Sequence, residues 1–269
     1  MLIGRMARIE GTSAKMHRAR DIITVCPPNL DRTGFLSLDN RLDGGAGLTS
    51  RDWLLDRLRD GFQIRMLRAP RKGFIAFAPG RASWWPVFGA DRCVVVQRLW
   101  VEAVNDSVAL LLTEAEEWAR YYGFWAVLAL IGQGVDRCAE ADLHARGYSI
   151  ADDSDAGVML CARILQGPTA LPRLPRDWGA RAAALGPGLV IQSAGHCPDQ
   201  TARAEALVSH AREAGLAARL DRIDSAQDAR NRLAAPGALF CVALDGEIID
   251  TGQGTAPEIW QVIRRSKRL

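Results

Sequence analysis

The sequence predicts an α/β protein built of two domains, and three observations support this expectation. Its 269 residues suggest two domains at about 150 residues each. Apolar runs of strand length alternate with stretches of helical periodicity, which is typical of α/β folds. Residues 165–187 contain four prolines, which break regular hydrogen-bonding patterns, so we expect an extended linker there. The first domain then covers residues 1–164 and the second covers residues 188–269.

The first domain is expected to hold a mixed sheet with flanking helices, behind an irregular tail over residues 1–20. The pattern TSRD at residues 49–52 resembles a capping box and starts a helix that ends at Gly61. Residues 93–101, CVVVQRLWV, are apolar enough at their start for a central strand buried on both faces. Apolar residues three and four apart predict a helix over residues 108–122. Further strands are expected over residues 62–68, 73–77, 124–131, 148–151 and 158–164, with a short helix before Gly147.

The second domain is expected to be compact, with a βαβ-αββα order. The dipeptide Asp245-Gly246 between two apolar runs is a strong hairpin signal. Thr255 and Glu258 have the spacing of a helix cap and its partner. The elements are strands over residues 188–193, 216–223, 238–244 and 247–250, and helices over residues 201–214, 225–232 and 255–266.

Composition excludes several classes of protein. A hydrophobic fraction of 48% and a charged fraction of 24% exclude a disordered chain. No apolar run approaches the ~18 residues of a membrane-spanning helix, and a net charge of +3 lacks the clustered Lys and Arg of a nucleic-acid-binding face. The six cysteines form no CxxC pair and no zinc-ligand spacing. We therefore expect a cytoplasmic protein without a metal site, a membrane anchor or a nucleic-acid partner.

Two stretches of the chain together resemble the YoaP-like branch of the GNAT acetyltransferases. The first runs from GFIAFAPGRASWWPVFG through CVVVQRLWV and ALLLTEAEEWARYYGF to ADLHARGYSIAD. The second comprises VIQSAGHCPDQ and DSAQDARNRLAAPGALFCVALDGEII. The resemblance implies a GNAT-like first domain joined to a thioredoxin-like second domain. It also implies an acyl-CoA-dependent N-acyltransferase that acts on a small amine or a peptide, with acetyl-CoA or another acyl-CoA as cofactor.

The resemblance places the acyl-CoA site at the end of the central strand and in the turn that follows. A GNAT pyrophosphate turn usually contains glycines, whose backbone N–H groups approach the phosphates at a helix N-terminus. Here the small positions fall on Asp106 and Val108, or on Asn105 and Ser107 after a one-residue shift, and Glu102 adds a second acid. The turn therefore has the pattern of a degenerate CoA site, or of a simple helix N-cap cluster. The implied cofactor-binding residues are Trp100, Val101, Asn105, Ser107 and Val108.

Candidate catalytic groups in the first domain are few. Glu102 is the best-placed general base, although a solvated edge carboxylate has the same pattern. Many GNAT enzymes carry a Tyr four residues before the Gly-aromatic pair, and that position is Leu143 here, which cannot protonate a thiolate. Trp84 and Trp85 are candidates for an aromatic substrate pocket, with core or domain-interface packing as the alternative.

The second domain offers a thiol. Cys197 follows a strand and precedes a helix, where the helix dipole lowers the pKa of a thiol, and protonated His196 would lower it further. Gln200 stands where a resolving cysteine would be, which excludes a dithiol cycle within the motif. The thioredoxin resemblance also implies a cis-proline at Pro236. Cys93, Cys161 and Cys241 lie in apolar strands and are expected to be buried.

Three functions stay open at this stage. The first is the N-acyltransferase. The second is a non-catalytic GNAT-like protein that binds a ligand or peptide, with a protein partner on the thioredoxin-like domain. The third is a thiol-dependent activity centred on Cys197.

Overall fold

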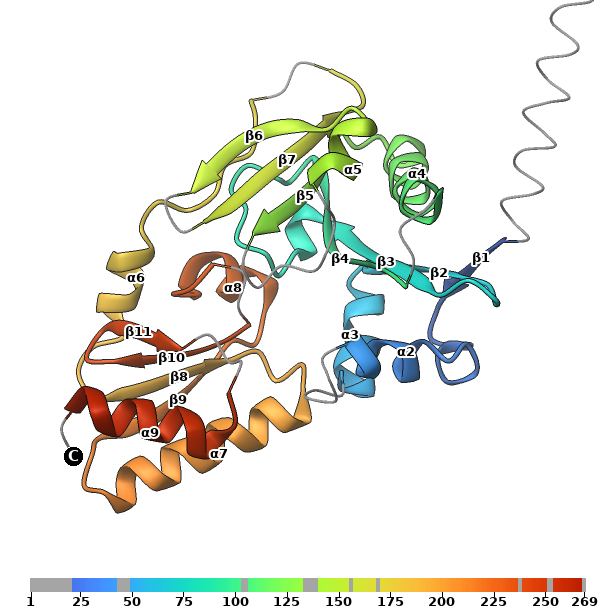
Figure 1. Cartoon of the computed structure of the whole chain (residues 1–269). Coiled ribbons are helices and arrows are strands. Elements are labelled where there is room, and N and C mark those ends of the chain that lie inside the picture. The colour runs from blue at the N-terminus through green and yellow to red at the C-terminus, as the bar shows by residue number, and fades with distance from the viewer. Residues whose placement is uncertain are drawn as a thin grey trace, which may run out of the picture.

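The computed structural model describes residues 21–42, 49–102, 106–132, 140–154, 157–167, 170–236, 239–250 and 254–267. These residues form two separate sheets, each with helices packed against it (Figure 1). We refer to residues 21–164 as the N-terminal region and to residues 189–267 as the C-terminal region. The predicted α/β class, with a mixed sheet and flanking helices, is confirmed.

The N-terminal region holds a seven-stranded sheet in the order β1-β2-β3-β4-β5-β7-β6. Neighbouring strands are antiparallel except for β4 and β5. These two strands run parallel, so the chain must cross over between them, and it does so through a helix. Its strands are β1 (Ile22–Val25), β2 (Gln63–Leu67), β3 (Gly73–Pro79), β4 (Cys93–Val101), β5 (Ala126–Gly132), β6 (Ser149–Ser154) and β7 (Val158–Ile164). Its helices are η1 (Leu30–Arg32), α2 (Phe35–Leu42), α3 (Arg51–Arg59), η2 (Gly80–Ala82), α4 (Asp106–Tyr121) and α5 (Glu140–Ala145).

Different segments cover the two faces of this sheet. On one face, α4 packs Val108, Leu111 and Leu112 against β3, β4 and β5, which accounts for its apolar periodicity. On the other face, Phe35 of α2 and Leu54 of α3 pack against β2 and β3. The loop after η2 covers the same face over β4, β5 and β7. β4 is central and its first five residues are buried, as the sequence predicts.

The C-terminal region holds a four-stranded sheet in the order β11-β10-β8-β9, in which β8 and β9 are parallel and the other pairs antiparallel. The predicted βαβ-αββα order is confirmed. Asp245 and Gly246 have φ values of 51° and 81°, which is the left-handed geometry that this hairpin turn requires. The elements are β8 (Leu189–Ser193), α7 (Pro198–Glu213), β9 (Ala218–Arg222), α8 (Ala226–Arg232), β10 (Phe240–Leu244), β11 (Glu247–Asp250) and α9 (Ala256–Lys267).

Three features differ from the expectations. β1 and α2 were not predicted, because four and eight residues are too few for a clear period. The proline-rich stretch contains a short helix, α6 (Trp178–Ala184), whose seven residues lie between Pro175 and Pro187. The cis peptide bond recorded in the described residues joins Ala69 to Pro70, so the expected cis bond at Pro236 is wrong. Trans is the default for an X–Pro bond, and Pro236 follows it.

Candidate functional site

The parallel strands β4 and β5 separate in the middle of the N-terminal sheet. They pair only from Cys93 with Ala126 to Val95 with Leu128. Beyond that point β4 continues for six residues to Val101, and β5 continues to Gly132 along β7. Within the described residues, backbone groups on this edge of β4 therefore have no strand partner, and α4 begins shortly after β4 ends. We call this place, where the two strands separate next to a helix N-terminus, the opening.

A bulge in β4 lies where the strands separate. The register with β3 shifts between the pairs Ala76–Arg98 and Phe77–Val96, so Gln97 is the extra residue. The Gln97 side chain is buried, and its Oε1 accepts the backbone N–H of Trp84 at 3.2 Å. Its Nε2 donates to Ser83 Oγ at 3.0 Å. The bulge is therefore fixed by the loop that carries the two adjacent tryptophans.

Trp85 lies on the separated part of β4. Its indole N–H donates to the backbone oxygen of Gln97 at 3.0 Å, and the residue packs against the buried cluster that includes Val95 and Leu128, the last paired residues of the two strands. The structure therefore brings Trp85 to the opening, where the sequence analysis expected an aromatic pocket. The hydrogen bond also means that one carbonyl of β4 is already occupied by a side chain.

Trp84 points elsewhere. Its side chain is 3% exposed and packs against Ile223 and Leu233 of the C-terminal region, and its ring meets Trp53 edge-on at a centroid distance of 5.4 Å. Arg57 lies over both rings, at 5.3 and 5.0 Å from their centroids. Of the two predicted roles, packing at the interface between the regions applies to Trp84. Its neighbour Trp85 lies at the opening.

The end of β4 holds the residues expected to bind an acyl group. Trp100 and Val101 pair with Phe74 and Gly73 of β3 and are half-buried. A Cβ at residue 73 would lie 2.8 Å from the backbone oxygen of Trp100, so glycine is required for the two strands to approach this closely. The backbone at the end of β4 is thereby held in position at the opening.

The turn after β4 is only partly described, and Asn105 lies outside the described residues. Ser107 and Val108 belong to the first turn of α4 and are 2% and 3% exposed, so their side chains point into the core. Asp106 is the first residue of α4, where a carboxylate is favourable to the helix dipole. An acidic side chain thus stands where the resemblance implies a phosphate.

Both acids of this turn have basic partners on the segment between β2 and β3. Glu102 Oε1 lies 2.6 Å from Lys72 Nζ, and the Glu102 N–H donates to the Lys72 backbone oxygen at 3.0 Å. Asp106 Oδ1 lies 3.8 Å from Arg71 Nη1. These two cations offset part of the negative charge of Glu102 and Asp106, so the repulsion of phosphates is smaller than the two acids alone would cause. Glu102 is half-exposed and reaches solvent at the end of the central strand.

The position of the usual GNAT general acid is part of the core. Leu143 is 0% exposed and packs with α4 and the central strands. Among its neighbours on α5, His144 forms an exposed contact with Glu140 at 3.2 Å. Residue 143 is therefore an apolar core residue here, and it cannot act as the general acid that a tyrosine provides in many GNAT enzymes.

The thiol of Cys197 is buried at the N-terminus of α7. Its side chain is 3% exposed, and Sγ accepts the Gln200 N–H at 3.4 Å as the helix cap. Burial, with the nearby positive charge of Arg98, lowers the pKa of His196 to about 4. His196 is therefore neutral at pH 7, so the condition under which it would assist the thiol, a protonated ring, is not met there.

The other described cysteines divide by burial. Cys93, Cys161 and Cys241 are buried in strands, as expected, and burial raises the pKa of Cys93 to about 11 and that of Cys241 to about 12. Cys26 is partly exposed. In the described part of the chain no group of three or more His, Cys, Asp or Glu could hold a metal ion, and no described helix is long and apolar enough to span a membrane.

Sequence reasoning missed Arg71, Lys72 and Gln97. The two cations face the acids across about thirty positions in the chain, and no local pattern links them. Gln97 could have been noticed as a polar residue inside an apolar strand pattern, which is a frequent sign of a bulge or a buried network.

No protein-family model matches the chain, and no curated protein matches its sequence. Solved structures match part of it. An acetyltransferase from Thermus thermophilus is 14% identical over 54% of this chain and 96% of its own, with a TM-score of 0.40. A ribosomal-protein-alanine N-acetyltransferase from Brucella melitensis is 20% identical over 54% and 99%, with a TM-score of 0.41. The PaiA N-acetyltransferase from Thermoplasma acidophilum, in complex with coenzyme A, is 13% identical over 54% and 99%, with a TM-score of 0.38.

Proposed function

We propose that the chain is an acyl-CoA-dependent N-acyltransferase of the GNAT type that acts on a small amine or a peptide. The observation that carries the proposal is the separation of β4 and β5 after Val95 and Leu128, beside the start of α4. An exposed strand edge offers backbone donors and acceptors to an extended amide-containing chain, as in strand addition. A helix N-terminus beside it favours phosphate groups. Together these two features suit an acyl-CoA.

The residues around the opening fit such a cofactor. Arg71 would hold its phosphates beside the start of α4, and the backbone of Trp100 and Val101 would hold its acyl end. To do so Arg71 must exchange Asp21 and Asp106 for phosphate oxygens, while Lys72 keeps its pairing with Glu102. When bound, the acyl-CoA supplies an activated thioester. Glu102, at the end of β4, would then accept the proton that the attacking amine loses.

The test is calorimetric titration of the full chain with acetyl-CoA, using Asp106→Asn and Asp52→Asn. Both aspartates lie in the first turn of a helix and are 80% and 92% exposed, so Asp52 is the matched control. We expect micromolar binding by the unmodified chain, tighter binding by Asp106→Asn, and no change in Asp52→Asn. The reason is that Asn has nearly the same shape as Asp but no negative charge to repel phosphate. Absence of binding in all three proteins would refute the proposal.

A second candidate function is non-catalytic binding of an acyl-CoA or a related ligand. Burial of Leu143 in the core favours it, because the general acid found in many GNAT enzymes has no substitute at that position. The two functions differ in turnover. Release of free thiol from acetyl-CoA in the presence of a panel of amines and peptides would support catalysis, and its loss in Glu102→Gln would support the role given to that carboxylate.

We further propose that the C-terminal region is a thioredoxin-like domain, with boundaries at residues 1–164 for the first domain, 165–187 for the linker and 188–269 for the second. The linker packs against the first domain at Arg173 and Leu174. The strand order β11-β10-β8-β9 supports the proposal. A thiol-dependent activity has less support, because Cys197 Sγ is buried and serves as a helix cap. A role in binding a protein partner, or in shaping the acceptor site of the first domain, suits this region better.

A further inference from the structure

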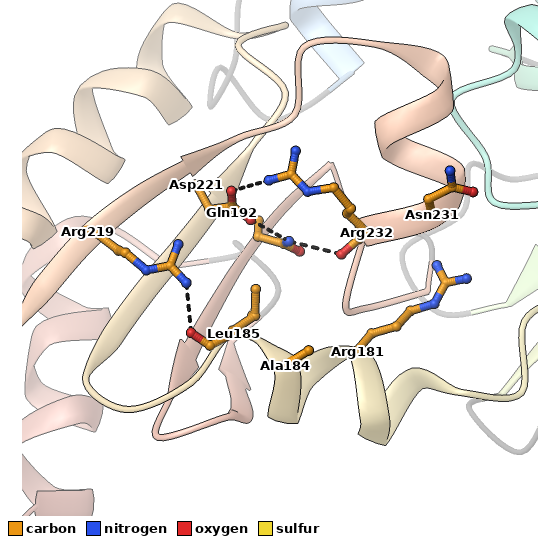
Figure 2. Close-up of a pocket in the computed structure, with 8 residues that line it drawn as sticks. All are labelled: Arg181, Ala184, Leu185, Gln192, Arg219, Asp221, Asn231 and Arg232. Atoms are coloured by element: carbon orange, nitrogen blue, oxygen red, sulfur yellow. Dashed lines mark hydrogen bonds and ion pairs between the residues drawn. The ribbon is translucent and has the colours of Figure 1, made fainter.

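A cavity of about 310 Å³ lies in the C-terminal region, between α6 and the side of the sheet on which α8 lies (Figure 2). Three arginines from three different elements line it: Arg181 of α6, Arg219 of β9 and Arg232 of α8. Figure 2 shows their guanidinium groups placed around the pocket, and Asp221 is the one carboxylate in its lining. The volume is at the lower end of the range for small-molecule pockets.

The floor of the cavity is a fixed hydrogen-bond network. Gln192 is 0% exposed, and its Oε1 accepts the Ala234 N–H at 2.9 Å. Its Nε2 donates to Asp221 Oδ2 at 2.9 Å and to the Arg232 backbone oxygen at 3.0 Å. The second oxygen of Asp221 accepts from the Arg232 guanidinium. The acceptors that the floor presents are therefore already engaged.

Donors, in contrast, remain unused. Arg181 is 6% exposed, bonds through Nε to Asp177 and through Nη1 to two backbone oxygens, and lies over the rings of Phe88 and Trp178 at 5.6 and 5.2 Å. Among the described residues, no hydrogen-bond acceptor engages the two N–H groups of its Nη2. Arg219 bonds only through Nη2 to the Leu185 oxygen at 2.7 Å, and no carboxylate of the described residues pairs with it. A guanidinium has five N–H donors and no acceptor, and Arg219 is exposed, so both arginines keep N–H groups that a ligand can engage in place of water.

We propose that this cavity binds a small oxyanion, the phosphate or carboxylate group of a metabolite. Unused donors above a floor of satisfied acceptors suit a ligand that only accepts hydrogen bonds. Planar guanidinium groups bind phosphate and carboxylate oxygens in a bidentate manner. Asp177 and Asp228 pair with Arg181 and Arg232 from outside the lining, so Arg219 is the cation most available to the ligand. The site is in a different region from the proposed acyl-CoA opening and does not depend on it.

The test uses pyrophosphate and citrate as probes, titrated calorimetrically into the full chain and into Arg219→Gln. A matched control is Arg222→Gln, because Arg222 is also exposed and on β9 but does not line the cavity. Arg71→Gln, in the proposed acyl-CoA site, reports any binding of the probes at that other site. We expect the affinity to fall about tenfold or more in Arg219→Gln and to stay unchanged in Arg222→Gln, since hydrogen bonds to charged groups contribute this much.

Each outcome bears on the proposal. Tighter binding of pyrophosphate than citrate, with this variant pattern, identifies a phosphate ligand, and the reverse order identifies a carboxylate ligand. Equal weakening by Arg222→Gln would mean that only overall charge matters and would overturn the site. Weaker binding in Arg71→Gln alone would mean that the probe binds in the N-terminal region, and this result would also overturn the proposal. Absence of binding of either probe at millimolar concentration would refute the proposal and leave the acyltransferase proposal unaffected.

Discussion

The backbone N–H of Ser50 donates to the backbone oxygen of His196 at 2.7 Å. Ser50 caps α3 in the N-terminal region, and His196 precedes Cys197, which caps α7 in the C-terminal region. The Trp53 ring lies 6.0 Å from the His196 ring, centroid to centroid. The loop that carries the thiol is therefore held against the first region.

Stability should fall in acid because of His196. Burial lowers the pKa of His196 from 6.5 to about 4, so between these values the unfolded chain binds a proton that the folded chain does not. The free energy of unfolding should then decrease as pH falls from 6.5 to 4, by up to about 1.4 kcal/mol per pH unit. Urea unfolding at pH 7 and at pH 5 measures this change in the free energy of unfolding. His196→Gln should show a smaller difference between the two pH values than the control His210→Gln, since His210 is 46% exposed.

Thiol reactivity should follow burial rather than motif. In the native chain, iodoacetamide at pH 8 should modify Cys26 fastest, since it is the least buried of the described cysteines. Cys93, Cys161, Cys197 and Cys241 should react only after unfolding. Peptide mass mapping against time distinguishes each thiol. Modification of Cys197 as fast as Cys26 would contradict the burial argument and restore the thiol-dependent function as a candidate.

A buried carboxylate joins α4 to the sheet. Glu116 is 1% exposed, and its two oxygens lie 2.8 Å from Arg163 of β7 and 3.0 Å from Arg146. Glu116→Leu would leave both guanidinium groups without their buried partner, and we expect a loss of about 3–5 kcal/mol in the free energy of unfolding. Chemical denaturation of this variant and of Glu213→Leu, at a carboxylate that is 71% exposed, provides the comparison. A similar small change in both would show that the network contributes little.

The contact between the two regions should depend on Trp84. Truncation to Ala removes a large side chain that is 3% exposed among Ile223, Leu233 and Trp53, so we expect a cost of about 3–5 kcal/mol. A second contact between the regions remains in this variant, because Arg230 Nη1 donates to the backbone oxygens of Gly80 and Arg81 at 3.0 and 2.7 Å. These two hydrogen bonds do not restore the apolar packing that Trp84 provides. Denaturation followed by tryptophan fluorescence and by circular dichroism should give coincident curves for the unmodified chain and separate curves for Trp84→Ala. Tyr121→Ala, at an aromatic residue that is 82% exposed, should behave as the unmodified chain does.

The strands and helices with a clear local pattern of apolar residues could be predicted from the sequence. The run CVVVQRLWV predicted a buried central strand because parallel strands covered on both faces are continuously apolar. The helix α6 escaped prediction because its seven residues lie among prolines and are held by Arg181, which reaches carbonyls some fifty positions away. The same limit applies to the site. The pattern marked Glu102, Trp84 and Trp85, but pairing with Lys72 and the opposite directions of the two tryptophans arise only in the folded chain.

The segment after β7 determines where a fragment containing the first half of the chain should end. Arg173 exchanges backbone hydrogen bonds with Phe88 at 2.8 and 3.0 Å, and the Leu174 N–H donates to Asp152 Oδ2 at 2.7 Å. Leu174 itself is 3% exposed within the core of the N-terminal sheet. A protease that cleaves exposed loops should spare this stretch, and a shortened version of the first half that stops at residue 164 would expose part of its own interior. Ending it after Arg176, which also pairs with Asp152, keeps that surface covered.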